Sequence, residues 1–313
     1  MISNLIIALE AVLPMFVIMS IGVLIKRIKL ITDEETKRFN SIIFHVCFGP
    51  LMFNNIYGKK IGEVFDLKLV IFTVCAVALL YISATIFTLK VEKNQKSRGA
   101  MIQAIYRSNF IIMGIPIVAN IFGSDNLTLT ALMIMIVVPI YNVLAVVTLE
   151  VYRGAKPKAS RILFGLAKNP IILGALAGLL SVAFNVKLPS VFEGIISDIA
   201  NVTTPMMLII LGASFSFQSV ENCKRNLIFC VIGRLIIAPG IGLSLAALIG
   251  IRDVAFVTLI ALFAAPTAIS SFSMAQEMDS DTELAGNAVI FSSGLSCLTM
   301  FLWIFLFKTL GMF

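Results

Sequence analysis

The chain has 313 residues, of which 59% are hydrophobic and 13% are charged, and its mean hydropathy is +1.02. Soluble domains are roughly 45–50% apolar and about 25% charged, so the composition excludes an ordinary soluble protein and indicates one embedded in a lipid bilayer. The formal net charge of +7 does not indicate nucleic-acid binding, because the basic residues lie in short loops between apolar segments. In that position they act as signals of membrane topology.

The sequence predicts neither a metal site nor a cofactor. The five cysteines form no CxxC pair, and the single histidine, His45, has no acidic or thiol partner at ligand spacing. A glycine-rich loop that would cradle phosphate is missing, and so are the Ser/His, paired Asp or HExxH patterns of an intramembrane enzyme. We therefore expect no enzyme activity and no cofactor.

Ten segments are long enough to cross a bilayer, which takes a helix of about 20 apolar residues. They are approximately 3–25, 39–57, 67–89, 99–122, 127–151, 163–185, 191–217, 226–249, 254–278 and 283–310. With the N-terminus placed outside, the inward-facing loops hold most of the lysine and arginine. The positive-inside rule then predicts a multi-pass protein of the cell membrane with both termini outside.

The two halves of the chain, 1–155 and 156–313, resemble each other in the order of a few residues. The matches are Pro14 and Gly22 with Pro170 and Gly178, Pro50 with Pro205, Ser124-Asp125 with Ser280-Asp281, and Pro116 with Pro266. Because each half contains five spans, an odd number, the second half is inserted upside down. The sequence therefore predicts an all-α fold of two inverted five-helix repeats, a construction found in secondary transporters.

Two matching spans are interrupted by proline. Gly114 and Pro116 lie in the segment 99–122, and Pro266 lies in the segment 254–278. Proline has no N–H to donate, and within lipid each freed backbone group needs a partner or a cavity. Paired, broken helices mark the binding site of many transporters, and their N-terminal ends suit an anion. The alternative is a pair of simple kinks. We expect the two breaks to cross near the middle of the membrane.

Polar residues in these spans are the candidates for binding. Asn109 can donate to a carboxylate, and Arg107 and Arg234 can attract an anion. Asp198 is a candidate partner for either arginine, or a proton carrier. For each, helix packing or snorkelling to the interface is the alternative. The predicted substrate site comprises Arg107, Asn109, Gly114, Ile115, Pro116, Ala265, Pro266, Thr267 and Asn54, and Asp198 with Arg234 form a candidate ion pair or coupling site.

The segment SNFIIMGIPIVANIFGSD (108–125) resembles the fourth-helix motif of the auxin efflux carrier family, which includes plant PIN carriers and bacterial malate and malonate permeases. KNPIILGALAGLL (168–180) and IISDIANVTTPMMLIILGASFS (195–216) resemble its sixth and seventh helices. The resemblance implies a scaffold of helices 1, 2, 6 and 7 and a transport unit of helices 3–5 and 8–10. It also implies crossing helices 4 and 9, as in sodium/proton antiporters and bile-acid symporters. A carboxylate would bind near Asn109, motion would be elevator-like, and members often form dimers.

Two departures from the plant members favour an organic acid over auxin. Ile171 stands where plant carriers have a second asparagine, and the span 67–89 lacks their charged pair. The prediction is a secondary transporter of a small organic anion such as malate or malonate, with H⁺ or Na⁺ as the candidate coupling cation. One alternative is a sodium-coupled bile-acid-type symporter, whose cation needs oxygen ligands such as Ser271 and Gln276. The other is a membrane sensor that binds but does not cycle.

Overall fold

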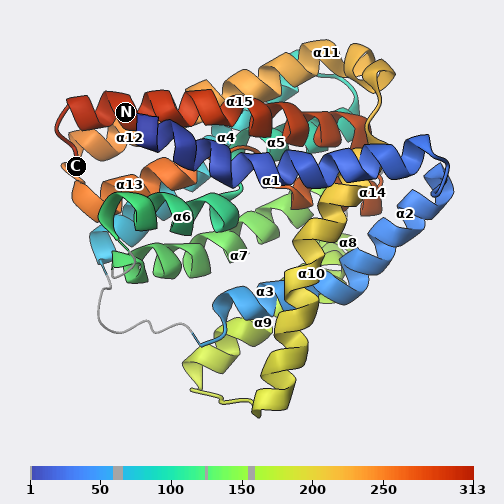
Figure 1. Cartoon of the computed structure of the whole chain (residues 1–313), viewed down its shortest axis with the longest axis horizontal. Helices are drawn as coiled ribbons and strands as arrows, with labels where there is room; N and C mark the ends of the chain where they lie inside the picture. Colours follow the sequence, from blue (N-terminus) through green and yellow to red (C-terminus); the bar gives the residue numbers. More distant parts are fainter. Residues whose placement is uncertain (1, 59–65, 124–125, 154–158) are drawn as a thin grey trace.

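The computed structural model describes residues 2–58, 66–123, 126–153 and 159–313, and the regular structure of these ranges is helical (Figure 1). Two short segments, η1 and η3, are π-helical. The elements are α1 (Ile2–Arg27), α2 (Asp33–Ile42), η1 (Ile43–Cys47), α3 (Phe48–Ile56), α4 (Leu67–Val91), α5 (Gln95–Tyr106), α6 (Phe110–Phe122), α7 (Thr128–Val151), α8 (Ala159–Lys168), α9 (Pro170–Ala183), α10 (Ser190–Ser214), α11 (Phe217–Ile232), η3 (Gly233–Ile237), α12 (Ala238–Leu248), α13 (Asp253–Phe263), α14 (Ser270–Glu277) and α15 (Thr282–Thr309).

Within the described ranges, five continuous helical stretches are long and apolar enough to cross a membrane. They are Leu67–Val91, Thr128–Val151, Ser190–Ser214, Phe217–Leu248 and Thr282–Thr309. Shorter apolar helices, Phe110–Phe122, Pro170–Ala183 and Asp253–Phe263, accompany them. The chain is therefore an all-helical, multi-pass membrane protein, as its composition predicted.

Polar residues at the loop ends fix where several helices begin. The Thr32 side chain accepts from the backbone N–H of Glu35, whose carboxylate accepts from the N–H of Thr32, and this capping box starts α2. Single side-chain caps start three other helices, where one oxygen accepts an N–H of the first turn: Asp66 for α4, Asn169 for α9 and Asp281 for α15. These contacts satisfy N–H groups that a helix start otherwise leaves without a partner.

The break in the segment 99–122 does not lie where the sequence predicted. Gly114 and Pro116 lie inside α6, and the helix is interrupted earlier, at residues 107–109. Pro116 removes only the bond that its own nitrogen would make, so α6 continues past it. The break in the segment 254–278 does include Pro266, because the chain is not helical from Ala264 to Ile269.

Glycines allow two pairs of helices to pack at backbone contact. A Cβ on Gly22 of α1 would lie 2.0 Å from the carbonyl oxygen of Ile209 in α10, and one on Gly212 would lie 2.0 Å from that of Met19. A Cβ on Gly174 of α9 would lie 2.2 Å from a carbonyl oxygen of α3. Figure 1 shows α3, α9 and part of α10 side by side. Small residues that let backbones approach are typical of helix packing in membranes.

Candidate functional site

Two unwound segments cross inside the protein. Residues 107–109 connect α5 to α6, and residues 264–269 connect α13 to α14. They run antiparallel, with Ser108 paired to Thr267. The N–H of Asn109 donates to the oxygen of Pro266 at 2.8 Å, and the N–H of Ala268 donates to the oxygen of Arg107 at 3.3 Å. We call these two segments the crossover.

The carbonyl groups that end α5 all have partners. The oxygen of Gln103 accepts from the N–H of Arg107 at 3.0 Å, and the oxygen of Ala104 accepts from the hydroxyl of Thr267 at 2.9 Å. The next two, Ile105 and Tyr106, accept from the guanidinium of Arg234, at 3.3 and 2.9 Å. An α-helix end otherwise leaves four carbonyls unpaired, so side chains from other helices make this break tolerable inside a membrane.

Arg234 holds the ends of both broken helices. It lies in η3 and is fully buried. Its Nη1 reaches the end of α5, while its Nη2 donates to the oxygens of Leu262, at 3.3 Å, and Phe263, which end α13. Each helix C-terminus carries a charge equivalent of about −0.5, so two of them together balance one guanidinium.

The structure does not pair Asp198 with Arg234. Asp198 is exposed on α10, and no carboxylate of the described residues lies within ion-pair distance of Arg234. The reason is geometric, since the two donor ends of Arg234 already face backbone carbonyls.

Arg107 is also buried, with 3% of its surface exposed, so it does not snorkel to the interface. Its Nη1 donates to Oε1 of Gln103 at 3.2 Å and to Sδ of Met274 at 3.0 Å, and its Nη2 donates to Oδ1 of Asn142 at 2.5 Å. Asn142 in turn donates to Sδ of Met52 at 3.1 Å. All of these acceptors are neutral, and among the described residues no carboxylate pairs with Arg107.

Asn109 provides a free donor at the same place. Its side chain is 7% exposed, and its Nδ2 has no hydrogen-bond partner among the described residues. It precedes the first turn of α6, whose side-chain cap is absent. The crossover therefore combines a buried cation on neutral acceptors, an unpartnered amide donor and a helix N-terminus.

The other predicted substrate residues divide into two groups. Ala265, Pro266 and Thr267 are buried within the crossover. Further along α6, Gly114 is buried, with the Phe110 ring 3.0 Å from where a Cβ would lie. Ile115 and Pro116 are exposed and face away from the interior, while Asn54 is half-buried on α3 and forms no hydrogen bond with the described residues of the crossover. The structure does not bring Ile115, Pro116 and Asn54 to the buried cluster around Asn109.

Sequence reasoning missed Gln103 and Met274, which hold the Arg107 guanidinium. Gln103 had a recognisable signal, because it is a polar residue one helical turn before an arginine within an apolar segment. Met274 had none, since a methionine in an apolar span is usually core.

Comparison with known proteins agrees with the membrane architecture. A family model described as membrane transport protein matches residues 7–304. An uncharacterized transporter of Methanocaldococcus jannaschii is 24% identical over 310 residues, which cover 95% of this chain and 98% of that protein. An uncharacterized transporter of Methanothermobacter thermautotrophicus is 24% identical over 302 residues, covering 94% and 96%. The chain therefore belongs to the membrane transport protein family, the auxin efflux carrier family that its motifs resemble, and is a membrane transporter.

Proposed function

We propose that this transporter is a secondary carrier that moves a small organic anion, a mono- or dicarboxylate, by alternating access. The observation that carries the proposal is the Arg107 guanidinium, which is buried at the crossover without a carboxylate partner among the described residues. Burying a charge without a counter-charge costs free energy. A bound carboxylate would recover part of that cost.

In this proposal the carboxylate binds at the start of α6. The free Nδ2 of Asn109 donates to it, and the first N–H groups of α6 add their partial positive charge. Arg107 supplies the full charge next to this place. Arg234 acts differently, because its Nη1 and Nη2 donate to carbonyls of α5 and α13. It holds the crossover together and does not contact the substrate.

Ten crossings in two inverted repeats, 1–155 and 156–313, are part of the proposal. The contacts between elements support it. In such a repeat, span 1 corresponds to span 6 and span 2 to span 7, so the packing of α1 on α10 is the equivalent of the packing of α9 on α3. The two interrupted spans correspond as well, and they meet at the crossover.

These helices, α1, α2, α3, α9 and α10, would then form the scaffold, through which two copies of the chain pair. The remaining helices would move as the transport unit in an elevator-like cycle. Both termini would lie outside the cell membrane, and H⁺ and Na⁺ remain the two candidate coupling cations.

Ligand-dependent thermal stability of the purified protein tests the site. Malate, malonate, succinate, lactate, indole acetate and taurocholate are compared in sodium and in potassium buffer. We expect a carboxylate to raise the Tm of the wild type and of Asn120→Ala, an exposed asparagine of the same helix, but not that of Asn109→Ala. If Asn109→Ala responds like the wild type, the site is wrong. Stabilisation by taurocholate in sodium alone would favour the bile-acid-type symporter.

Counterflow of the stabilising acid in proteoliposomes then separates a carrier from a protein that only binds. A carrier exchanges internal for external acid, whereas a sensor with the same fold binds the acid without exchange. Absence of counterflow under conditions where the acid binds would refute the proposed transport cycle.

A further inference from the structure

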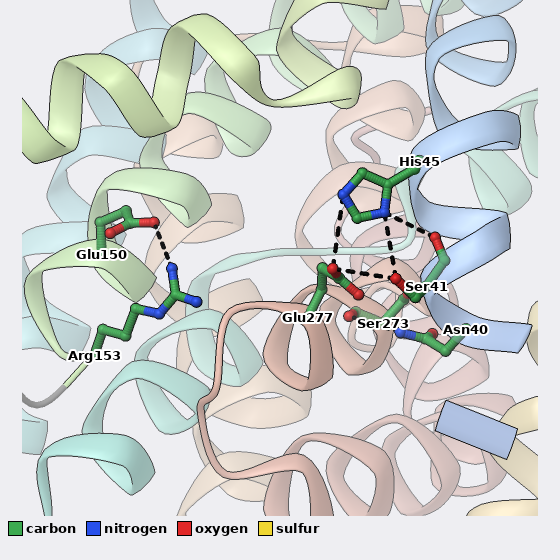
Figure 2. A network of polar contacts seen from close by, with 7 residues as sticks. All are labelled: Asn40, Ser41, His45, Glu150, Arg153, Ser273 and Glu277. Atoms are coloured by element: carbon green, nitrogen blue, oxygen red, sulfur yellow. Dashed lines mark hydrogen bonds and ion pairs between the residues drawn. The ribbon is translucent and has the colours of Figure 1, made fainter. Parts of the chain in front are cut away.

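A group of polar contacts joins α2 and η1 to α14. Figure 2 shows the carboxylate of Glu277 between the hydroxyl of Ser41 and the ring of His45. The Ser41 hydroxyl donates to Oε1 of Glu277 at 3.3 Å, and Nε2 of His45 lies 3.7 Å from the same oxygen. One turn earlier, Nδ2 of Asn40 donates to the carbonyl oxygen of Ser273 at 3.3 Å. We call these five residues the α2–α14 clasp.

Five of the eleven buried side-chain polar atoms that have no hydrogen-bond partner among the described residues come from the helices around this clasp. They are Oδ1 of Asn40, Nε2 of Gln103, the hydroxyls of Ser271 and Ser273, and Oε1 of Gln276. All come from α2, α5 and α14, and α14 packs on both of the other helices. Folded proteins pair nearly all buried polar groups. These five unpaired atoms need an explanation, and we call the set the α14 polar seam.

The seam extends between the crossover and one surface of the membrane. At one end, Oε1 of Gln103 accepts from Arg107, which also donates to Met274 of α14. At the other end lies Glu277, the last residue of α14. With the N-terminus outside, that end of α14 faces the cytoplasm. The seam thus lies along the inner half of the molecule, between a helix of the proposed scaffold and a helix of the proposed transport unit.

The outer half differs. There α6 occupies the place that α14 has in the inner half, and it packs against α1. Among the described side chains, α6 forms no hydrogen bond with a helix of the proposed scaffold. In the described part of the chain, the clasp fastens the inner side, and Nδ2 of Asn142 on α7 also donates to Sδ of Met52 on α3 at 3.1 Å.

We propose that the α14 polar seam is the inner access route to the crossover and that the α2–α14 clasp closes it in this conformation. The inference rests on the proposed alternating-access function. When α14 moves relative to α2, water fills the seam and pairs its polar groups. In the closed conformation the same polar groups have no water to pair with, which explains why they are unpaired here.

Cysteine accessibility tests the route without any substrate. In a background with the five native cysteines replaced, Ser273→Cys is exposed to a membrane-impermeant maleimide from the cytoplasmic side. We expect slow labelling, which becomes about two- to fivefold faster when Glu277→Gln is added, the change expected for loss of a partly exposed contact to a carboxylate. Glu283→Gln is the matched control, since Glu283 is an acid of the adjacent helix without an ion pair among the described residues.

A second cysteine reports on general loosening. Thr130 is buried on α7, bonded to Thr258 of α13 at 2.8 Å, and both belong to the proposed transport unit. Thr130→Cys should stay unlabelled with and without Glu277→Gln. Equal labelling of Ser273→Cys in the presence and absence of Glu277→Gln would overturn the clasp. Faster labelling of both cysteines would show unfolding instead of gating and would also count against it.

Cross-linking tests the same contact by locking it closed instead of weakening it. Oxidation of Ser41→Cys with Glu277→Cys should block cytoplasmic labelling of Ser273→Cys, and reduction should restore it. Free labelling in the cross-linked protein would refute the route. Since labelling requires no ligand, accessibility that changes as expected in a protein that binds no organic anion would refute the proposed substrate and leave the gate standing.

Discussion

Replacement of Arg234 by methionine should destabilise the protein strongly. Methionine keeps most of the apolar stem but removes donors to four carbonyls, those of Ile105, Tyr106, Leu262 and Phe263. It also removes the positive charge that faces two helix C-termini. Removing one partner of a buried, charge-balanced group typically costs about 3–5 kcal/mol. At roughly 2–4 °C per kcal/mol for a domain of 150–250 residues, the Tm should fall by roughly 6–20 °C.

The assay is thermal unfolding of the detergent-purified protein, followed by the loss of the monodisperse peak in size-exclusion chromatography. Arg252→Met is the matched control, because Arg252 also donates to a backbone carbonyl, that of Gly311 at 2.8 Å, but is exposed. Its loss should cost less than about 1 kcal/mol. Arg234→Lys keeps the charge without the planar fork and should lie between the two. If Arg234→Met melts like Arg252→Met, Arg234 does not hold the crossover together.

Two further predictions concern packing and a surface carboxylate. Gly22→Ala would place a methyl group 2.0 Å from a carbonyl oxygen of α10. It should lower the free energy of unfolding by at least about 1–3 kcal/mol, measured by thermal unfolding. Gly194→Ala is the control, because Gly194 has open space around it, and it should leave stability unchanged or slightly higher. Partial burial raises the pKa of Glu92, but bonds from Asn94, Asn226 and Lys93 outweigh it and hold the pKa below its usual value. This carboxylate therefore stabilises the fold above its ordinary pKa and loses that effect as pH falls through the lowered value. The difference in Tm between wild type and Glu92→Gln should thus shrink from pH 6 toward pH 3, and a constant difference would contradict the linkage.

The sequence predicts the helical spans better than the contacts between them. Apolar length and the position of Pro266 are local signals, and they correctly indicated a membrane protein with an interrupted segment around Pro266. The break at residues 107–109 is different, because its backbone groups are paired by a segment about 160 residues away. No local pattern reveals such a partner. Pro116 drew attention to the correct span but lies about two turns past the break.

Arg234 shows the same limit for the site. From the sequence, an arginine in an apolar span suggested either an ion pair or a substrate contact. The acceptors turned out to be backbone carbonyls, which every residue carries and which therefore leave no trace in the sequence. Only the broken ends of α5 and α13 make these carbonyls available. The contacts of Arg234 follow from the fold, whereas Asp198, the partner that residue type alone had suggested, is exposed and not paired with it.

The direction of hydrogen bonding at the crossover supports the anionic ligand of the proposed function. The carbonyls that end α5 accept from Arg107, Thr267 and Arg234, so this side of the break has few acceptors left to coordinate a cation. The donors are what remain: the Nδ2 of Asn109 has no partner, and the first turn of α6 lacks a side-chain cap. A ligand that completes this arrangement has to accept hydrogen bonds. A carboxylate accepts hydrogen bonds through two oxygens, and it carries the negative counter-charge that is missing beside Arg107.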